Sequence, residues 1–261
     1  MKKTIFYLSF GIISNLTSAN SHCFLVKENN QFIKQEGECR TRYAPCSTFK
    51  IAISLMGYNE GLLIDETHPK YPFQEGYVAW LKRWQQSHNP RLWLKNSCVW
   101  YSQVLTKKLG MKKFQEYVRK FKYGNQDVSG DKGKNNGLTN SWLSSSLKIS
   151  PEEQIHFLQK MNNQKLPVEV KALKMTENIL YIEDLASGWK LFGKTGNGSQ
   201  LNKDKTKNLD HQLGWFVGWI QKANRKIVFA KLILDKDKQE SYASLRAKSF
   251  VKKNILKIVG K

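Results

Sequence analysis

The amino-acid sequence predicts an α+β fold in which an antiparallel sheet, flanked by terminal helices, carries an inserted all-helical region. Strand-like segments occur at both ends of the 261-residue chain, whereas its middle is mostly helical with long loops. The polar loops between the late strands leave no room for a crossover helix, so neighbouring strands are expected to be antiparallel. The length suits one large domain or two closely packed lobes.

The first residues, 1–19, have the features of a secretory signal peptide. Lys2 and Lys3 are positively charged, the stretch that follows is mostly apolar, and small residues end at Ala19. That stretch is too short to span a membrane, and no later segment is apolar enough to do so. We expect cleavage near Ala19 and a periplasmic or secreted mature protein without stable membrane insertion, an uncleaved anchor being the alternative.

The mature chain, residues 20–261, is expected to form a single catalytic domain with two lobes. Residues 20–57 and 185–261 would form the sheet lobe, and residues 58–184 the helical lobe. Apolar stretches at Cys23 to Val26 and Gln31 to Ile33 flank a turn and predict the first two strands. A site is expected at the seam between the lobes.

Three more strands are expected late in the chain, at residues 189–196, 213–220 and 226–234. The first of them is expected to end in a turn at its Lys-Thr-Gly sequence. Residues 241–259 have apolar positions at helical spacing and predict an amphipathic C-terminal helix.

The formal net charge is +22, and it falls to +20 when Lys2 and Lys3 leave with the signal peptide. The basic residues are spread along the chain, and in residues 111–121 they lie opposite an apolar helix face. Nucleic-acid sites instead gather positive charge in one patch or stripe. We therefore expect no nucleic-acid partner.

Four cysteines, Cys23, Cys39, Cys46 and Cys98, allow one or two disulfides in an oxidising compartment. Four cysteines can pair fully in three ways, and the sequence does not choose among them. Cys46 and Cys98 each adjoin a candidate catalytic serine, and we interpret them as small buried packing residues. No Cys/His cluster has the spacing of a zinc site, so no metal is predicted.

Ser47 and Lys50 are the first candidate catalytic pair. Residues three apart on a helix share one face, so the lysine can take the proton of the serine and activate it as a nucleophile. The same spacing occurs at four other places, where a solvated surface pair is the preferred interpretation: Ser129–Lys132, Ser145–Lys148, Ser187–Lys190 and Ser249–Lys252. Only the Ser47 copy is followed by an apolar helix and then by Ser-x-Val and Lys-Thr-Gly.

A second serine and a second lysine lie further along the chain. Ser97 stands two residues before Val99, and Lys194 is followed by Thr195 and Gly196. If the fold brings them to the first pair, Ser97 can relay protons and Lys194 can hold an anionic substrate.

Five motifs together resemble the class D serine β-lactamases, the oxacillinases. They are Ser47-Thr48-Phe49-Lys50, Ser97-Cys98-Val99, Tyr123-Gly124-Asn125, Trp142-Leu143 and Lys194-Thr195-Gly196. Their order and spacing agree over nearly the whole mature chain. The resemblance implies a serine β-lactamase/transpeptidase-like fold and the hydrolysis of β-lactam antibiotics, such as penicillins and oxacillin-type compounds.

The resemblance implies a role for each motif residue in the chemistry. Ser47 would attack the β-lactam carbonyl and form an acyl-enzyme. Backbone N–H groups of Ser47 and Asn197 would form the oxyanion hole. Ser97 would carry a proton to the ring nitrogen, while Tyr123 and Asn125 would support the site.

The resemblance also implies the substrate contacts. Lys194, Thr195 and Gly196 would line the substrate site, with the first two holding the carboxylate. Arg246 would bind the same carboxylate, an exposed residue on the last helix being the alternative interpretation. Val99 would lie beside the substrate. Besides the small-molecule β-lactam no partner is implied, and the protein would be a monomer or a homodimer.

In the family that this chain resembles, the motif lysine is carboxylated by carbon dioxide, which stands in place of a conventional cofactor. Lys50 would therefore become a carbamate and act as the general base. The amine must be neutral to react, so apolar burial must depress its pKa. Phe49, Val99 and Leu143 would supply those surroundings, and Trp142 would donate its indole N–H to the carbamate.

The chain departs from the family pattern after Lys-Thr-Gly, where Asn197 and Gly198 replace a common apolar residue. This bears on the substrate profile. The polar segment 200–211 is expected to be a long loop beside the site, with His211 a loop residue.

Two related classes are the alternatives. Penicillin-binding transpeptidases and carboxypeptidases usually have Ser-x-Asn where this chain has Ser-x-Val, which favours the lactamase. β-Lactam sensor domains acylate without efficient turnover, but they normally hang from membrane helices that this sequence lacks. A basic, envelope-associated binding protein is a third and weaker alternative.

Overall fold

The computed structural model describes residues 22–202 and 207–260. The predicted signal peptide, residues 1–19, lies outside the described residues. Within them, no helix combines the length and the apolar character needed to cross a membrane.

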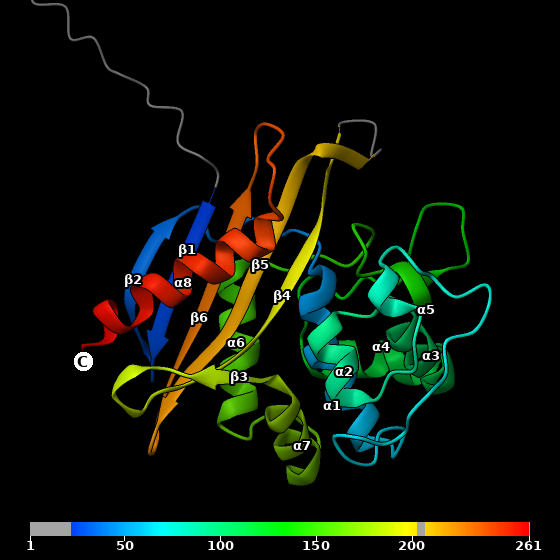
Figure 1. The fold of residues 1–261 in the computed structure, drawn as a ribbon, viewed down its shortest axis with the longest axis horizontal. Helices are drawn as coiled ribbons and strands as arrows, with labels where there is room; N and C mark the ends of the chain where they lie inside the picture. Colours follow the sequence, from blue (N-terminus) through cyan, green and yellow to red (C-terminus); the bar gives the residue numbers. More distant parts are fainter. Residues whose placement is uncertain (1–21, 203–206, 261) are drawn as a thin grey trace, which may run out of the picture.

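One antiparallel sheet of six strands organises the molecule, in the order β2-β1-β6-β5-β4-β3 (Figure 1). The strands are β1 (His22–Glu28), β2 (Gln31–Gly37), β3 (Tyr181–Asp184), β4 (Lys190–Leu201), β5 (Lys207–Lys222) and β6 (Arg225–Leu234). β1 pairs with β6, so the two ends of the chain meet in the sheet. This confirms the predicted α+β fold.

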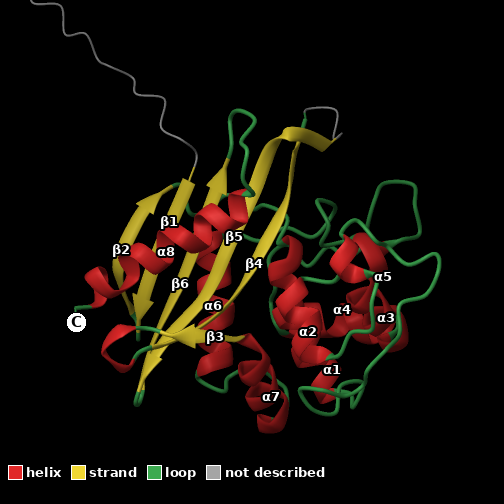
Figure 2. Ribbon diagram, viewed as in Figure 1, coloured by secondary structure: helices red, strands yellow, loops and turns green. Residues whose placement is uncertain are grey.

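The helices gather beside the sheet and on its two faces (Figure 2). They are α1 (Lys50–Asn59), α2 (Pro90–Asn96), α3 (Val99–Leu109), α4 (Met111–Lys120), α5 (Gly137–Asn140), α6 (Pro151–Asn162), α7 (Val170–Leu180) and α8 (Ala243–Val259), with short 3-10 turns η1 (Cys46–Phe49), η2 (Lys82–Trp84) and η3 (Ala186–Gly188). The predicted amphipathic helices correspond to α4 and α8.

Each face of the sheet has its own apolar core. α8 lies on one face, where Val251 and Ile255 pack with Phe216 and Phe229 of the sheet. On the other face α6 packs against β6 and β1, and its core continues into the helical region. The alternation of side chains along a strand explains how β5 serves both cores, because Trp215 belongs to one and Phe216 to the other.

The prediction that the Lys-Thr-Gly strand ends in a turn is wrong. β4 continues to Leu201, and its pairing with β5 runs from Lys190 opposite Gln221 to Leu201 opposite Lys207. The polar segment predicted as a loop from 200 to 211 is therefore largely the outer part of a β-hairpin. Its strands are joined by backbone hydrogen bonds, which do not need an apolar sequence.

Two further features differ from the expected division of the chain. β3 is a strand within the segment predicted to be helical, and it pairs only with residues Lys190 to Phe192 of β4. β3 does not pair with the residues of β4 that follow Phe192. Helix α1, mostly assigned to the sheet lobe, packs instead on α7, α3 and α4.

The cysteines form a single disulfide among the described residues, between Cys23 and Cys39. Cys46 and Cys98 are not disulfide-bonded and are buried. Their burial agrees with the interpretation of these two residues as packing residues.

Candidate active site

The turn η1 presents Ser47, and the helix that follows it presents Lys50. Lys50 is the first residue of α1 and is fully buried. Its Nζ donates a hydrogen bond of 3.0 Å to Ser47 Oγ. The expected contact between the two side chains is present, although Ser47 stands in the 3-10 turn and not within the α-helix.

Burial makes the amine of Lys50 unusually acidic. Loss of water around the charged form lowers the pKa of Lys50 to about 8, with a smaller opposing effect from the neighbouring Cys98 and Cys46. A lysine in water titrates near 10.4. At neutral pH a far larger fraction of the Lys50 side chain is therefore uncharged than is the case for a lysine at the protein surface.

Phe49, which stands next to Lys50 in the sequence, belongs to a buried aromatic cluster. The ring of Phe49 lies 5.7 Å from that of Trp142 and 5.0 Å from that of Tyr123, measured between centroids. Val99 and Leu143 are also buried. Trp142 holds the turn directly, because its carbonyl oxygen accepts a 3.0 Å hydrogen bond from the N–H of Cys46.

Two polar atoms of this aromatic cluster, the hydroxyl of Tyr123 and the indole Nε1 of Trp142, are buried without a hydrogen-bond partner among the described residues, and only the indole is purely a donor. Trp142 is fully buried, and its Nε1 has no hydrogen-bond partner among the described residues. A buried donor without an acceptor costs about 1–3 kcal/mol, so such groups usually mark a ligand, water or modification.

Ser97 and Lys194 form the second pair. Ser97 ends α2 in a left-handed conformation, with φ of 55°, which turns the chain sharply into α3. Lys194 Nζ donates to Ser97 Oγ and, at 3.0 Å, to the carbonyl oxygen of Thr195. Burial lowers the pKa of Lys194 well below its usual value, with further lowering from the positive charges of Lys50 and Lys248.

Two glycines let the turn η1, which carries Ser47, pack directly on β4. A Cβ atom at Gly196 would lie 2.8 Å from the carbonyl oxygen of Pro45 and 3.1 Å from the backbone nitrogen of Thr48. A Cβ at Gly198 would lie 2.6 Å from Cys46 Sγ. The glycine of Lys-Thr-Gly thus brings the strand against the Ser47 turn.

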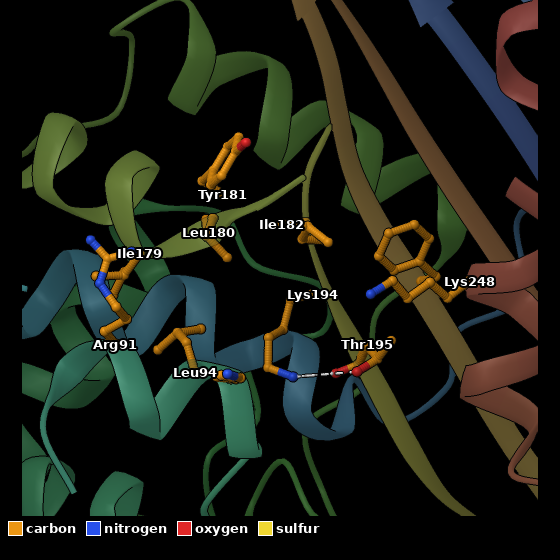
Figure 3. A pocket seen from close by; sticks show the side chains of 12 residues that line it. Arg91, Leu94, Ile179, Leu180, Tyr181, Ile182, Lys194, Thr195 and Lys248 are labelled. Carbon is orange, nitrogen blue, oxygen red and sulfur yellow. Dashed lines mark hydrogen bonds between the residues drawn. The ribbon is translucent and has the colours of Figure 1, made fainter. Parts of the chain in front are cut away.

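A cavity of about 480 Å³ begins at Lys194 and Thr195 and extends to β3, between α2, α7 and α8 (Figure 3). Its apolar wall includes Leu94, Ile179, Leu180, Ile182 and Phe216. Four cationic residues line it as well: Arg91, Lys95, Lys194 and Lys248. Ser47 and Lys50 do not line this cavity, and Gly196, which lies against their turn, directly follows the lining residue Thr195 in β4.

The structure does not bring Arg246 to this cavity. Its Nη2 forms a 2.5 Å ion pair with the nearly buried carboxylate of Asp235. The same helix instead contributes Lys248. No motif marks Lys248, and the only signal is its position one turn after the start of α8, four residues from the buried Ser244.

The remaining predicted residues occupy supporting positions. The side chain of Asn197 accepts a 3.1 Å hydrogen bond from the N–H of Ser244 and so joins β4 to α8. Asn125 donates to the carbonyl of Ser146 and accepts from the N–H of Lys148. These contacts order the backbone around the site. Throughout residues 22–202 and 207–260, no three His, Cys, Asp or Glu side chains are grouped as metal ligands would be.

Comparison with known proteins identifies the family. The family model described as "Penicillin binding protein transpeptidase domain" matches residues 15–257. The chain is 44% identical over 207 residues to the β-lactamase OXA-9 of Klebsiella pneumoniae, covering 79% of this chain and 76% of the relative. It is 40% identical over 242 residues to the β-lactamase OXA-1 of Escherichia coli, covering 91% and 84%.

A solved structure agrees with these relatives. The crystal structure of the class D β-lactamase OXA-427 superposes with a TM-score of 0.87 at 43% identity, over 91% of this chain and 98% of that one. The chain belongs to the penicillin-binding transpeptidase domain family and, within it, to the class D serine β-lactamases.

Proposed function

We propose that the protein hydrolyses β-lactam antibiotics through an acyl-enzyme on Ser47. The observation that carries the proposal is the 3.0 Å contact between Ser47 Oγ and the buried amine of Lys50. A hydroxyl beside a buried, easily neutralised base is the arrangement of an activated nucleophile. The contact between Ser97 and Lys194 supplies a proton relay and a cation near it.

Acylation transfers one proton away from Ser47 and one onto the leaving nitrogen. Ser47 Oγ forms a bond to the lactam carbonyl carbon as its proton passes to Lys50. The C–N bond of the ring then breaks, and its nitrogen takes a proton from Ser97, which Lys194 orients. Ser97 regains a proton from Lys50, so the base is free again. Water later adds to the ester carbonyl and gives up a proton to the base, which passes it to Ser47 Oγ as the ester bond breaks.

We place the oxyanion hole at the backbone N–H groups of Ser47 and Asn197. Two donors in fixed positions stabilise the charge that develops on the carbonyl oxygen. The close packing of Gly196 against Pro45 and Thr48 supports this placement, because it brings the strand residue next to the nucleophile turn.

Carboxylation of Lys50 by carbon dioxide is the second part of the proposal. The surroundings fit such a group, because Lys50 is buried with a pKa lowered to about 8. The unpartnered Nε1 of Trp142 is a donor for an added oxygen. Carboxylation would supply an anionic base, while Phe49, Val99 and Leu143 exclude water from it.

We assign the substrate carboxylate to Lys194 and Thr195. Both line the cavity, and the buried ammonium of Lys194 is a strong partner for an anion. Arg246 is unsupported in this role, because its guanidinium is already paired with Asp235. The features of residues 1–19 support export of the protein to the periplasm.

Replacing Lys50 tests this mechanism. Lys50→Ala should lose turnover of benzylpenicillin by at least roughly 10²-fold, the usual contribution of a general base. Deacylation should suffer more than binding, so intact-mass spectrometry should detect a persistent adduct of one penicillin per protein. Lys132→Ala, which removes a lysine from an exposed Ser-x-x-Lys copy, should behave as wild type. Sustained turnover by Lys50→Ala would contradict the mechanism.

A further inference from the structure

We propose that the cavity beside Lys194 is a subsite for the ring substituent next to the substrate carboxylate, and that Lys248 makes this subsite prefer anionic substituents. The inference rests on the proposed function and deepens it by naming a substrate class. That class is the cephalosporins whose 3-substituent carries a negative charge.

The position of the cavity follows from the order of residues along β4. Gly196 packs against the nucleophile turn, and the two residues before it, Thr195 and Lys194, open the cavity. In a cephalosporin the carboxylate and the 3-substituent stand on adjacent ring atoms. With the lactam carbonyl at Ser47 and the carboxylate at Lys194, we place the substituent in the cavity, on the side toward β3.

The charges around the cavity are unbalanced. Its four cationic lining residues have no acidic counterpart among the described residues that line it. Arg91 is paired with Glu66, and Lys95 is exposed on α2. Lys194 is engaged by Ser97. Lys248 is the fourth cationic residue. It reaches into the cavity from α8, on the side opposite Arg91 (Figure 3).

The neighbours of Lys248 do not neutralise it. The carboxylate of Glu183 opposes the effect of burial on the pKa of Lys248, but it already lies 2.8 Å from Lys252 Nζ in an ion pair. Lys252 itself adds positive charge. Burial accordingly lowers the pKa of Lys248, and Lys248 in turn lowers that of Lys194. A bound anion would relieve this unfavourable burial of like charges, whereas a bound cation would increase it.

Two matched pairs of cephalosporins test the preference. Cefonicid and cefamandole share their acyl side chain, and cefonicid adds a sulfonate to the 3-substituent. Cephaloridine and cephalothin share theirs, and cephaloridine carries a pyridinium where cephalothin carries a neutral acetoxy group. The quantity to measure is kcat/KM for each compound with wild type and with Lys248→Gln, because comparing ratios between enzymes cancels the intrinsic reactivity of each compound.

In Lys248→Gln the cefonicid/cefamandole ratio should fall roughly tenfold, and the cephaloridine/cephalothin ratio should rise, since one charge-assisted contact is worth about a factor of ten or more. Lys248→Arg should keep the wild-type ratios. Lys253→Gln, on an exposed position of the same helix outside the cavity wall, should keep them as well.

Unchanged ratios in Lys248→Gln, with normal hydrolysis of the neutral compounds, would overturn the subsite and leave the proposed function standing. Failure of wild type to turn over any neutral compound would instead refute the proposed function. Carbenicillin against benzylpenicillin is a third arm. A change confined to that ratio would place the anion on the acyl side chain and would also overturn the inference.

Discussion

At the scale of single residues, two lysines each contact a serine, and both are buried. Their surroundings give them different tasks. Lys50 is fully buried, and this burial lowers its pKa to about 8, which favours a neutral amine that can act as a base or react with carbon dioxide. Lys194 opens onto a cavity, where an incoming carboxylate can compensate its charge.

Removing the indole N–H of Trp142 tests whether that donor serves an acceptor on Lys50. Trp142→Phe keeps an aromatic ring beside Phe49 but should raise the bicarbonate concentration needed for half-maximal activity by roughly tenfold, the value of one charge-assisted hydrogen bond. The carbamate signal in 13C NMR with labelled bicarbonate should weaken in parallel.

Trp219→Phe is the matched control. Trp219 is also fully buried with an unpartnered Nε1, but it stacks on Phe192 in the sheet. Its replacement should leave the bicarbonate dependence unchanged. Equal responses from the two variants would contradict a specific role of the Trp142 indole N–H at Lys50.

The pKa of Lys50 also sets a pH dependence. Its amine is neutral above about pH 8 and protonated below it, so the neutral fraction that can react with carbon dioxide should fall about tenfold per pH unit below that value. Activity measured from pH 9 to pH 6 should fall accordingly and be restored by added carbon dioxide. If added carbon dioxide changed the activity at no pH, the carboxylation of Lys50 would be contradicted.

The lowered pKa of Lys50 also makes the free energy of unfolding depend on pH. Between about pH 8 and the ordinary pKa of 10.5, the unfolded chain binds a proton at Lys50 that the folded chain does not. The contribution of Lys50 to the free energy of unfolding therefore rises with pH across that interval and is constant below it.

At the scale of elements, the packing of β4 on η1 brings the parts of the site together. Gly196→Ala places a methyl group 2.8 Å from a backbone oxygen, which no side-chain rotation can relieve. We expect a loss of kcat/KM for benzylpenicillin of roughly tenfold or more, because a small displacement of positioned groups is costly to catalysis. Steady-state kinetics beside a thermal melt would measure it.

Gly61→Ala provides the comparison for that substitution. Gly61 has a φ of 67°, so alanine there is strained, but no atom lies within 4 Å of the added Cβ. It should lower stability by about 1 kcal/mol and leave kcat/KM unchanged. A wild-type kcat/KM in Gly196→Ala would show that the close approach is dispensable.

The elements also show where the sequence was informative. Apolar periodicity predicted the paired strands at each end and the amphipathic helices α4 and α8, because burial of one face imposes that pattern. It did not reveal β3, a strand of four residues whose position depends on its partner. Nor did it show that β4 passes through Lys-Thr-Gly, since the outer hairpin is polar and held by backbone pairing.

At the scale of the whole molecule, the order of motifs predicted residues that the fold brings together from distant parts of the chain. Ser97 and Lys194 are 97 residues apart and in contact. The partner of Arg246 could not be predicted, because Asp235 carries no motif and reaches it only through the packing of α8 on the sheet. Lys248 was missed for the same reason.

The central claim is that Ser47 is acylated and then released by a base that depends on carbon dioxide. The most direct test is a time course of benzylpenicillin hydrolysis by the purified mature protein, with and without added bicarbonate. We predict turnover through many equivalents of substrate, faster with bicarbonate. A single stoichiometric burst that then stops, with or without bicarbonate, would contradict the account and indicate a protein that only traps its acyl-enzyme.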